Sequence, residues 1–127
     1  MPKGRSQDPS DHLPLPTASL HILLALRDGE KHGYAIMSET EQVSEGAVKL
    51  GPGTLYGSIK RLVEDGLIQE SARRPDPNLD DQRRRYYRLT GLGEQVCVAE
   101  VERLRALVER ASGTRVGTRF VTRPQEG

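Results

Sequence analysis

The chain has 127 residues, of which 29% are charged and 35% hydrophobic, and its formal net charge is +1. This length suits one compact domain with a core and is too short for two domains of ordinary size. There is no apolar run of the roughly 18 residues that a membrane span needs, no apolar segment typical of a secretory signal, and only one cysteine. We therefore expect a cytoplasmic protein without a membrane partner.

Two helices are predicted after an N-terminal arm. Residues 1–16 contain four prolines among polar side chains, so we expect this arm to be disordered. Thr17 can cap a first helix, which runs to residue 27 or 28, is apolar on nearly every side and stops at Gly29. A second helix is expected to begin near Gly33 and to end before Gly46. Its inward set would be Tyr34, Ile36, Met37 and Val43.

A short strand, a third helix, a hairpin and a long helix are predicted next. Residues 47–50 are a brief apolar piece expected to be extended, and the third helix should span residues 54–65. Two strands follow, over residues 67–74 and 84–89, with a turn-rich tip at 75–81. The last helix should run over residues 91–111, and residues 112–127 should form a flexible basic tail.

This order of elements is typical of a winged helix-turn-helix, which we predict for residues 17–90. The fold class would be mainly α with a small β hairpin, followed by a long C-terminal helix. In such domains the third helix enters the major groove of DNA and the hairpin lies along the sugar-phosphate backbone. Double-stranded DNA is therefore the expected partner.

The third helix has one apolar stripe and one face of small and cationic residues. Leu55, Ile59, Leu62 and Val63 recur at helical spacing. A glycine inside a helix costs about 1 kcal/mol relative to alanine, so Gly57 either serves close approach of a duplex or is merely tolerated. Tyr56, at the edge of the stripe, could contact a phosphate or could be a half-buried core residue. The candidate DNA-binding residues of this helix are Gly53, Thr54, Tyr56, Gly57, Lys60 and Arg61.

The predicted hairpin is locally basic. Between residues 71 and 90 there are six arginines against three aspartates. Two clusters of arginine at opposite ends of one hairpin repel unless an anion neutralises them, which favours phosphate contact over a merely solvated surface. The candidate phosphate-binding residues are Arg73, Arg74, Arg83, Arg84 and Arg85.

The last helix has a heptad pattern of apolar residues that predicts a homodimer. One stripe could cover its own domain while the other meets a partner, although both could also pack inside one monomer. The predicted interface consists of Leu92, Val96, Cys97, Val101, Leu104, Leu107 and Val108. Cys97 is interpreted as a packing residue and not as a redox switch.

Several motifs together resemble the PadR-type transcriptional regulators. They are the Gly-x-Leu-Tyr opening of the third helix at residues 53–56, its Gly-Leu-Ile exit at 66–68, and Tyr-Tyr-Arg-Leu-Thr at 86–90. The resemblance covers residues 17–111 and is to the shorter branch of the family, with a single C-terminal helix. It implies a repressor that binds an operator as a dimer, and it permits a small-molecule effector. The wing tip, residues 76–81, is more acidic than the resemblance implies.

Two other classes of function would need different features in the sequence. An enzyme needs a convergent catalytic set, but His12, His21 and His32 fall on three separate segments, so we expect no catalytic site, metal or cofactor. A winged helix that binds protein and not DNA would need an apolar outward face on the third helix. Lys60, Arg61 and glycines occupy that face, which favours sequence-specific DNA binding. Because the expected dimer is two-fold, its operator should be an inverted repeat.

Overall fold

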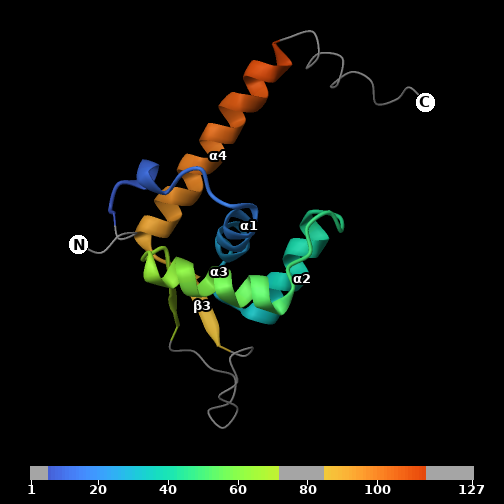
Figure 1. Ribbon diagram of the computed structural model, residues 1–127, viewed down its shortest axis with the longest axis vertical. Helices are drawn as coiled ribbons and strands as arrows, with labels where there is room; N and C mark the ends of the chain where they lie inside the picture. Colours follow the sequence, from blue (N-terminus) through green and yellow to red (C-terminus); the bar gives the residue numbers. More distant parts are fainter. Residues whose placement is uncertain (1–5, 72–84, 114–127) are drawn as a thin grey trace.

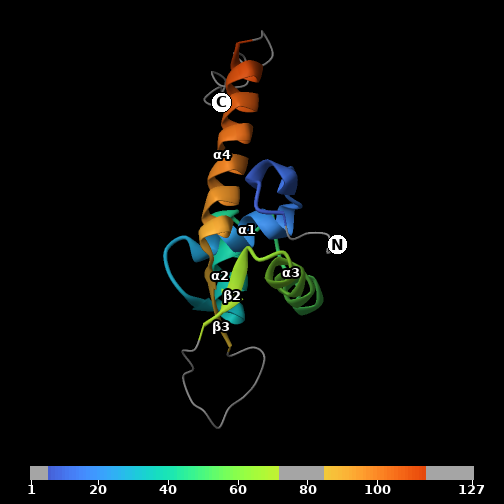
Figure 2. The ribbon, with the colours of Figure 1, turned by 90° about the vertical axis from the view of Figure 1, so that its left-hand side faces the viewer.

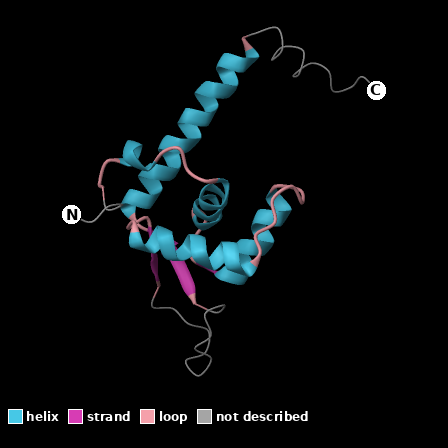
Figure 3. Ribbon diagram, in the orientation of Figure 1, coloured by secondary structure: helices cyan, strands magenta, loops and turns pink. Residues whose placement is uncertain are grey.

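The computed structural model describes residues 6–71 and 85–113. Helices dominate these residues, and the strands lie together beside α3 (Figures 1 and 3). The elements are η1 (Pro9–His12, a 3-10 helix), α1 (Thr17–Leu26), β1 (Lys31–His32), α2 (Gly33–Val43), α3 (Pro52–Glu64), β2 (Ile68–Glu70), β3 (Tyr86–Leu89) and α4 (Gly91–Ser112). The predicted fold class is confirmed. Among the described helices, none has the length and apolar character that a membrane crossing would require.

The sheet has three antiparallel strands in the order β1-β3-β2. β3 is central: Tyr87 lies opposite both Lys31 of β1 and Glu70 of β2. The short strand predicted at residues 47–50 is wrong, because that segment is a loop that buries Leu50, which is 8% exposed. The short strand of the fold is instead β1, a polar Lys-His pair whose composition gives no strand signal.

The core lies between α1, α3, the sheet and the first half of α4. The fully buried side chains of α1 are Ile22 and Leu23, which are both 0% exposed. The core also includes Leu55, Ile59, Leu62, Leu67, Ile68, Tyr87, Val96 and Cys97.

Two details of the first helices differ from the sequence predictions. Pro16 occupies the N-cap position of α1 without a side-chain cap, so Thr17 is the first helical residue and not the cap. Tyr34 and Val43 of α2 are 62% and 66% exposed, so their predicted inward orientation is wrong. One face of α2 meets the core, through the buried Ile36 and Thr40 and the partly buried Met37, so the inward orientation predicted for Ile36 and Met37 is confirmed.

Residues 6–16 are held against the domain, so the prediction of a disordered arm is wrong for them. Asp8 caps η1 by accepting a hydrogen bond from the backbone N–H of Ser10 at 3.0 Å. η1 packs beside α4, and Leu13 and Leu15 lie against the core. The backbone N–H of Leu15 donates to the carboxylate of Glu100 on α4 at 3.0 Å. Apolar residues between the prolines, together with this one acceptor, hold the segment.

Helix α4 has a buried half and a projecting half. Gly93, Val96, Cys97 and Glu100 are buried against the domain, whereas the second half extends beyond it (Figure 2). The prediction that Val96 and Cys97 line a dimer interface is wrong, because both are 0% exposed within one chain. Leu92 also packs against the same core.

Candidate nucleic-acid interface

Helix α3 is anchored by one face and leaves the opposite face open. Leu55, Ile59 and Leu62 are 0%, 3% and 3% exposed, and they join the core at the predicted spacing. Pro52 begins the helix, where its missing N–H leaves no helical hydrogen bond unmade. Gly66 ends the helix with a φ of +79°, a conformation that favours glycine.

The outward face of α3 is flat near its start and charged further along. Gly53, Gly57, Lys60 and Glu64 recur at spacings of four, three and four, so they share one side of the helix, and all four are exposed. A Cβ added at Gly53 or Gly57 would have no described atom within 4 Å. Packing among the described residues therefore does not require either glycine. The acidic Glu64 shares this face, as helical spacing predicts, and was not one of the candidate DNA-binding residues.

The two cations of α3 lie on different parts of its surface. Lys60 borders a groove that it shares with Glu70 and Arg85 of the wing strands. Arg61 borders a second hollow, on the other flank of α3, which it shares with Asp11 and His12 of η1. Lys60 is thus central on the outward face and close to the wing, whereas Arg61 faces the N-terminal segment.

Tyr56 is a half-buried packing residue. Its hydroxyl oxygen is buried, and its ring lies over the first residue of α2, where a Cβ on Gly33 would come within 2.5 Å of that oxygen. The predicted phosphate contact of Tyr56 is wrong, because a buried oxygen does not reach a phosphate. Gly33 and Tyr56 instead fix how closely α2 and α3 approach.

Of the predicted wing arginines, Arg85 is within the described residues, while Arg73, Arg74, Arg83 and Arg84 lie outside them. The Nε atom of Arg85 lies 3.7 Å from a carboxylate oxygen of Glu70 on the neighbouring strand, and its side chain is 37% exposed. The charge of Arg85 is therefore partly balanced by Glu70.

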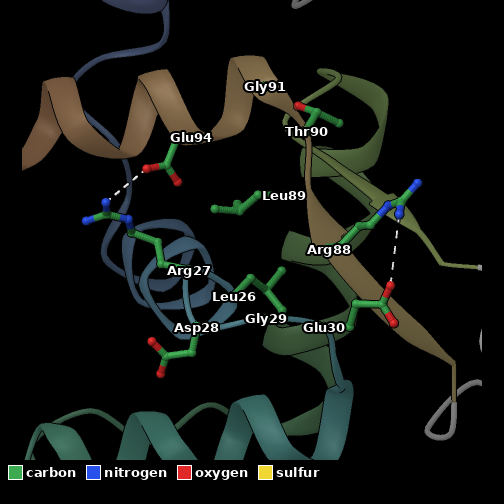
Figure 4. Close-up of a pocket in the computed structure, with 10 residues that line it drawn as sticks. All are labelled: Leu26, Arg27, Asp28, Gly29, Glu30, Arg88, Leu89, Thr90, Gly91 and Glu94. Atoms are coloured by element: carbon green, nitrogen blue, oxygen red, sulfur yellow. Dashed lines mark hydrogen bonds and ion pairs between the residues drawn. The ribbon is translucent and has the colours of Figure 1, made fainter.

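A hollow of about 480 Å³ lies on another side of the domain, between the α1–β1 turn and the β3–α4 junction. Figure 4 shows Leu26 and Leu89 between two ion pairs on its rim. Arg27 contacts Glu94 at 2.9 Å, and the second pair, Arg88 with Glu30, is at 4.0 Å. Asp28, also on the rim, lies 3.9 Å from Lys31. Four of the charged rim residues are therefore paired with one another, while the partner of Asp28 lies outside the lining of the hollow.

The three histidines are widely placed. His12 lies on η1, His21 on α1, and His32 caps α2 by accepting a hydrogen bond from Ala35 N–H at 3.1 Å. Within residues 6–71 and 85–113, no group of three His, Cys, Asp or Glu side chains could hold a metal ion.

Comparison with known proteins agrees with this architecture. Residues 22–99 match the model of the transcriptional regulator PadR-like family. The transcriptional regulator Rv3488 of Mycobacterium tuberculosis is 38% identical over 92 residues, which cover 72% of this chain and 77% of that protein. An uncharacterised 37.1 kDa protein of transposon Tn4556 from Streptomyces fradiae is 37% identical over 93 residues, which are 73% of this chain but only 24% of that protein.

Among solved structures, Bacillus subtilis PadR in complex with operator DNA has the same fold. The TM-score is 0.58 with 24% identity, over 69% of this chain and 48% of that one. The family match covers more than half of the chain and includes α3, the described wing strands and the first half of α4. The chain belongs to the PadR-like family of transcriptional regulators.

Proposed function

We propose that this chain is a homodimeric repressor that places α3 in the major groove of an inverted-repeat operator. The observation that carries the proposal is the open face of α3, where Gly53 and Gly57 leave room beside Lys60. An α-helix fits the major groove, and a cation there can meet the O6 and N7 atoms of guanine. The Bacillus subtilis relative of the same fold was solved with operator DNA.

The position of Lys60 makes it the main candidate for reading bases. It is exposed at the centre of the outward face, while Arg61 sits on the flank near η1. We therefore expect Lys60 to carry sequence preference, and Arg61 to reach either the edge of the groove or a backbone phosphate. The arginines of the wing, Arg73, Arg74, Arg83, Arg84 and Arg85, would supply phosphate contacts that add affinity without preference.

The second half of α4 supplies the proposed dimer interface. Leu107 and Val108 are 55% and 62% exposed, and Val101 and Leu104 are half-buried on the same side of the helix. These four residues continue the face that the first half of α4 buries in its own domain. A stripe of this kind on a projecting helix is typical of a helix that packs against a second copy.

The experiment is selection of bound fragments from the protein's own genome, followed by a salt titration on a selected duplex and a scrambled one. We expect Lys60→Ala to cost about 1–3 kcal/mol on the selected duplex and little on the scrambled one. Arg84→Ala should weaken binding to both duplexes and lower the log-log salt slope by roughly one. Equal losses on the two duplexes for Lys60→Ala would contradict base reading by this residue.

Repression and its release have separate tests. A selected fragment placed upstream of a reporter should lower expression when the protein is present, and a rise would identify an activator. A small-molecule effector that releases DNA is also part of the proposal, but we assign it no site. Selection of no fragment at all would instead favour the alternative, a winged helix that binds a protein.

A further inference from the structure

The start of α4 is joined to the end of α3 by a small set of backbone-centred contacts, which we call the α3–α4 joint. Its residues are Gly66, Leu67, Thr90 and Gly93. The hydroxyl of Thr90 donates to the carbonyl oxygen of Gly66 at 2.6 Å and accepts from the N–H of Gly93 at 3.0 Å. The N–H of Thr90 donates to the carbonyl oxygen of Leu67 at 3.1 Å. One residue thus caps α4 and binds the turn that follows α3.

Gly93 brings the two segments into direct backbone contact. A Cβ at this position would overlap the carbonyl oxygen of Leu67 and lie 2.9 Å from its carbonyl carbon. Gly91, two residues earlier, has no described atom within 4 Å of such a Cβ. The contact at Gly93 therefore depends on glycine for space, while Gly91 provides a matched position on the same turn of helix.

The α3 side of the joint is equally direct. The N–H of Leu67 donates to the carbonyl oxygen of Leu62 at 2.9 Å, and the N–H of Gly66 donates to Val63 at 3.0 Å. These bonds close the end of α3. A movement of α4 relative to the joint therefore changes the angle between α3 and α4, because the bonds of Thr90 and the backbone contact at Gly93 join the two segments directly.

The length of α4 converts a small change of angle into a large displacement. The segment from Gly93 to Ser112 spans about 28 Å at a rise of 1.5 Å per residue. A tilt of about 7° at the joint moves the far end of that span by about 3.5 Å, close to the rise of one base pair. The far half of α4 is the proposed dimer interface, so such a tilt changes the separation of the two copies of α3.

We propose that Thr90 and Gly93 are positioning residues that set the half-site spacing read by the dimer. The inference rests on the proposed function, since it needs a dimer joined through α4 and DNA contact through α3. The two residues do not touch the DNA. They act through the angle of α4, so they determine which spacing of half-sites both copies of α3 can contact together.

The test compares the wild type with Gly93→Ala, Thr90→Val and Thr90→Ser, with Gly91→Ala as the matched control. Each protein selects from a random duplex library, and the distribution of distances between inverted half-sites is counted. Affinity for a duplex with a single half-site is measured beside affinity for the selected repeat. Circular dichroism and sedimentation show which variants are folded dimers.

We expect Gly93→Ala and Thr90→Val to shift the preferred spacing by one base pair or more, or to lower affinity for the wild-type repeat by about 10-fold or more through lost bivalency. Single half-site affinity should change less than about two-fold, because α3 itself is intact. Thr90→Ser, which keeps the hydroxyl, and Gly91→Ala should both retain the wild-type spacing.

Folded dimers of Gly93→Ala and Thr90→Val with unchanged spacing and affinity would overturn the inference. So would an equal loss on the single half-site and the repeat, because the residues would then act on α3 itself. If Gly93→Ala does not fold, Thr90→Val decides the question. If the wild type selects no sequence, the proposed function is refuted. If the wild type selects a repeat and the variants keep its spacing, only the role of Thr90 and Gly93 in setting that spacing is refuted.

Discussion

Glu100 is the strongest single candidate for a destabilising substitution outside the apolar core. It is 1% exposed on α4, and its carboxylate accepts hydrogen bonds from Leu15 N–H at 3.0 Å and from the Nε and Nη2 atoms of Arg103 at 2.6 and 3.0 Å. Glu100→Ala leaves the N–H of Leu15 without its acceptor and removes the partner of Arg103. We therefore expect the N-terminal segment, residues 6–16, to detach from α4.

The magnitude follows from how exposed each partner is. A hydrogen bond from a partly buried amide to a charged group contributes about 1.5–3 kcal/mol. Arg103 is 43% exposed, so water can replace the carboxylate there, and the ion pair contributes only about 0–1 kcal/mol. We expect Glu100→Ala to lower the free energy of unfolding by about 1.5–4 kcal/mol in total. The matched control is Glu102→Ala, whose side chain is 61% exposed and 3.7 Å from Arg105, with an expected change below about 0.5 kcal/mol.

The assay is urea unfolding followed by circular dichroism at one fixed protein concentration, with limited proteolysis near residue 13 as a local readout. The pKa of Glu100 is lowered, chiefly by the hydrogen bond from Arg103. A carboxyl group whose pKa is lower in the folded chain stabilises the protein at pH values above its pKa in the unfolded chain. The contribution of Glu100 should therefore be complete above about pH 5 and lost as the pH falls through its folded-state pKa. If the free energies of unfolding of Glu100→Ala and Glu102→Ala differ by less than about 0.5 kcal/mol at pH 7, the reasoning is refuted.

Three further predictions concern the interface, the open helix face and the thiol. Val108→Glu should dissociate the dimer in sedimentation velocity at micromolar concentration, while Val98→Glu, 40% exposed on the first half of α4 and outside the proposed interface, should not; equal behaviour would contradict the assigned face. Gly57→Ala should raise the free energy of unfolding by up to about 1 kcal/mol yet weaken DNA binding, and unchanged binding would remove the close-approach argument. Burial raises the pKa of the Cys97 thiol, so it should resist alkylation at neutral pH until the chain is unfolded in urea, and rapid native-state labelling would contradict this.

The anchored face of α3 was predictable because a single periodicity determined it. Leu55, Ile59 and Leu62 follow helical spacing in a segment that glycines bracket, and they are buried as predicted. Val63, included in the same predicted stripe, is 39% exposed. It lies at the rim of the stripe, where it borders the groove beside the wing.

Features that depend on contacts between distant segments were not predictable. β1 is two polar residues long and exists only because β3 pairs with it. In the N-terminal segment, the N–H of Leu15 donates to Glu100, which is 85 residues away in sequence. The proline content of residues 6–16 indicated disorder, because composition shows only how much apolar surface a segment has. It does not show whether another element supplies a hydrogen-bond acceptor for that segment.

The heptad pattern of α4 also did not determine which surface covers its apolar face. A repeat of apolar residues shows which face of a helix is covered, but core packing and dimer packing produce the same spacing. In the structure the burial of this face within one chain changes near Glu100, an acidic residue that stands on the apolar face. Before it, Val96 and Cys97 are 0% exposed; after it, Leu107 is 55% exposed.

A buried carboxylate at that point is tolerated because the N-terminal segment and Arg103 satisfy it. The same contacts place residues 6–16 beside the boundary between the buried and projecting halves of α4. If the projecting half holds a second copy, the segment lies next to the dimer contact, and loosening it should weaken dimerisation as well as folding. Glu100→Ala should then lower the association constant of the dimer, measured by sedimentation at pH 7 under native conditions. Glu102→Ala should leave this constant unchanged. A normal dimerisation constant in folded Glu100→Ala would confine the role of the segment to the stability of one protomer.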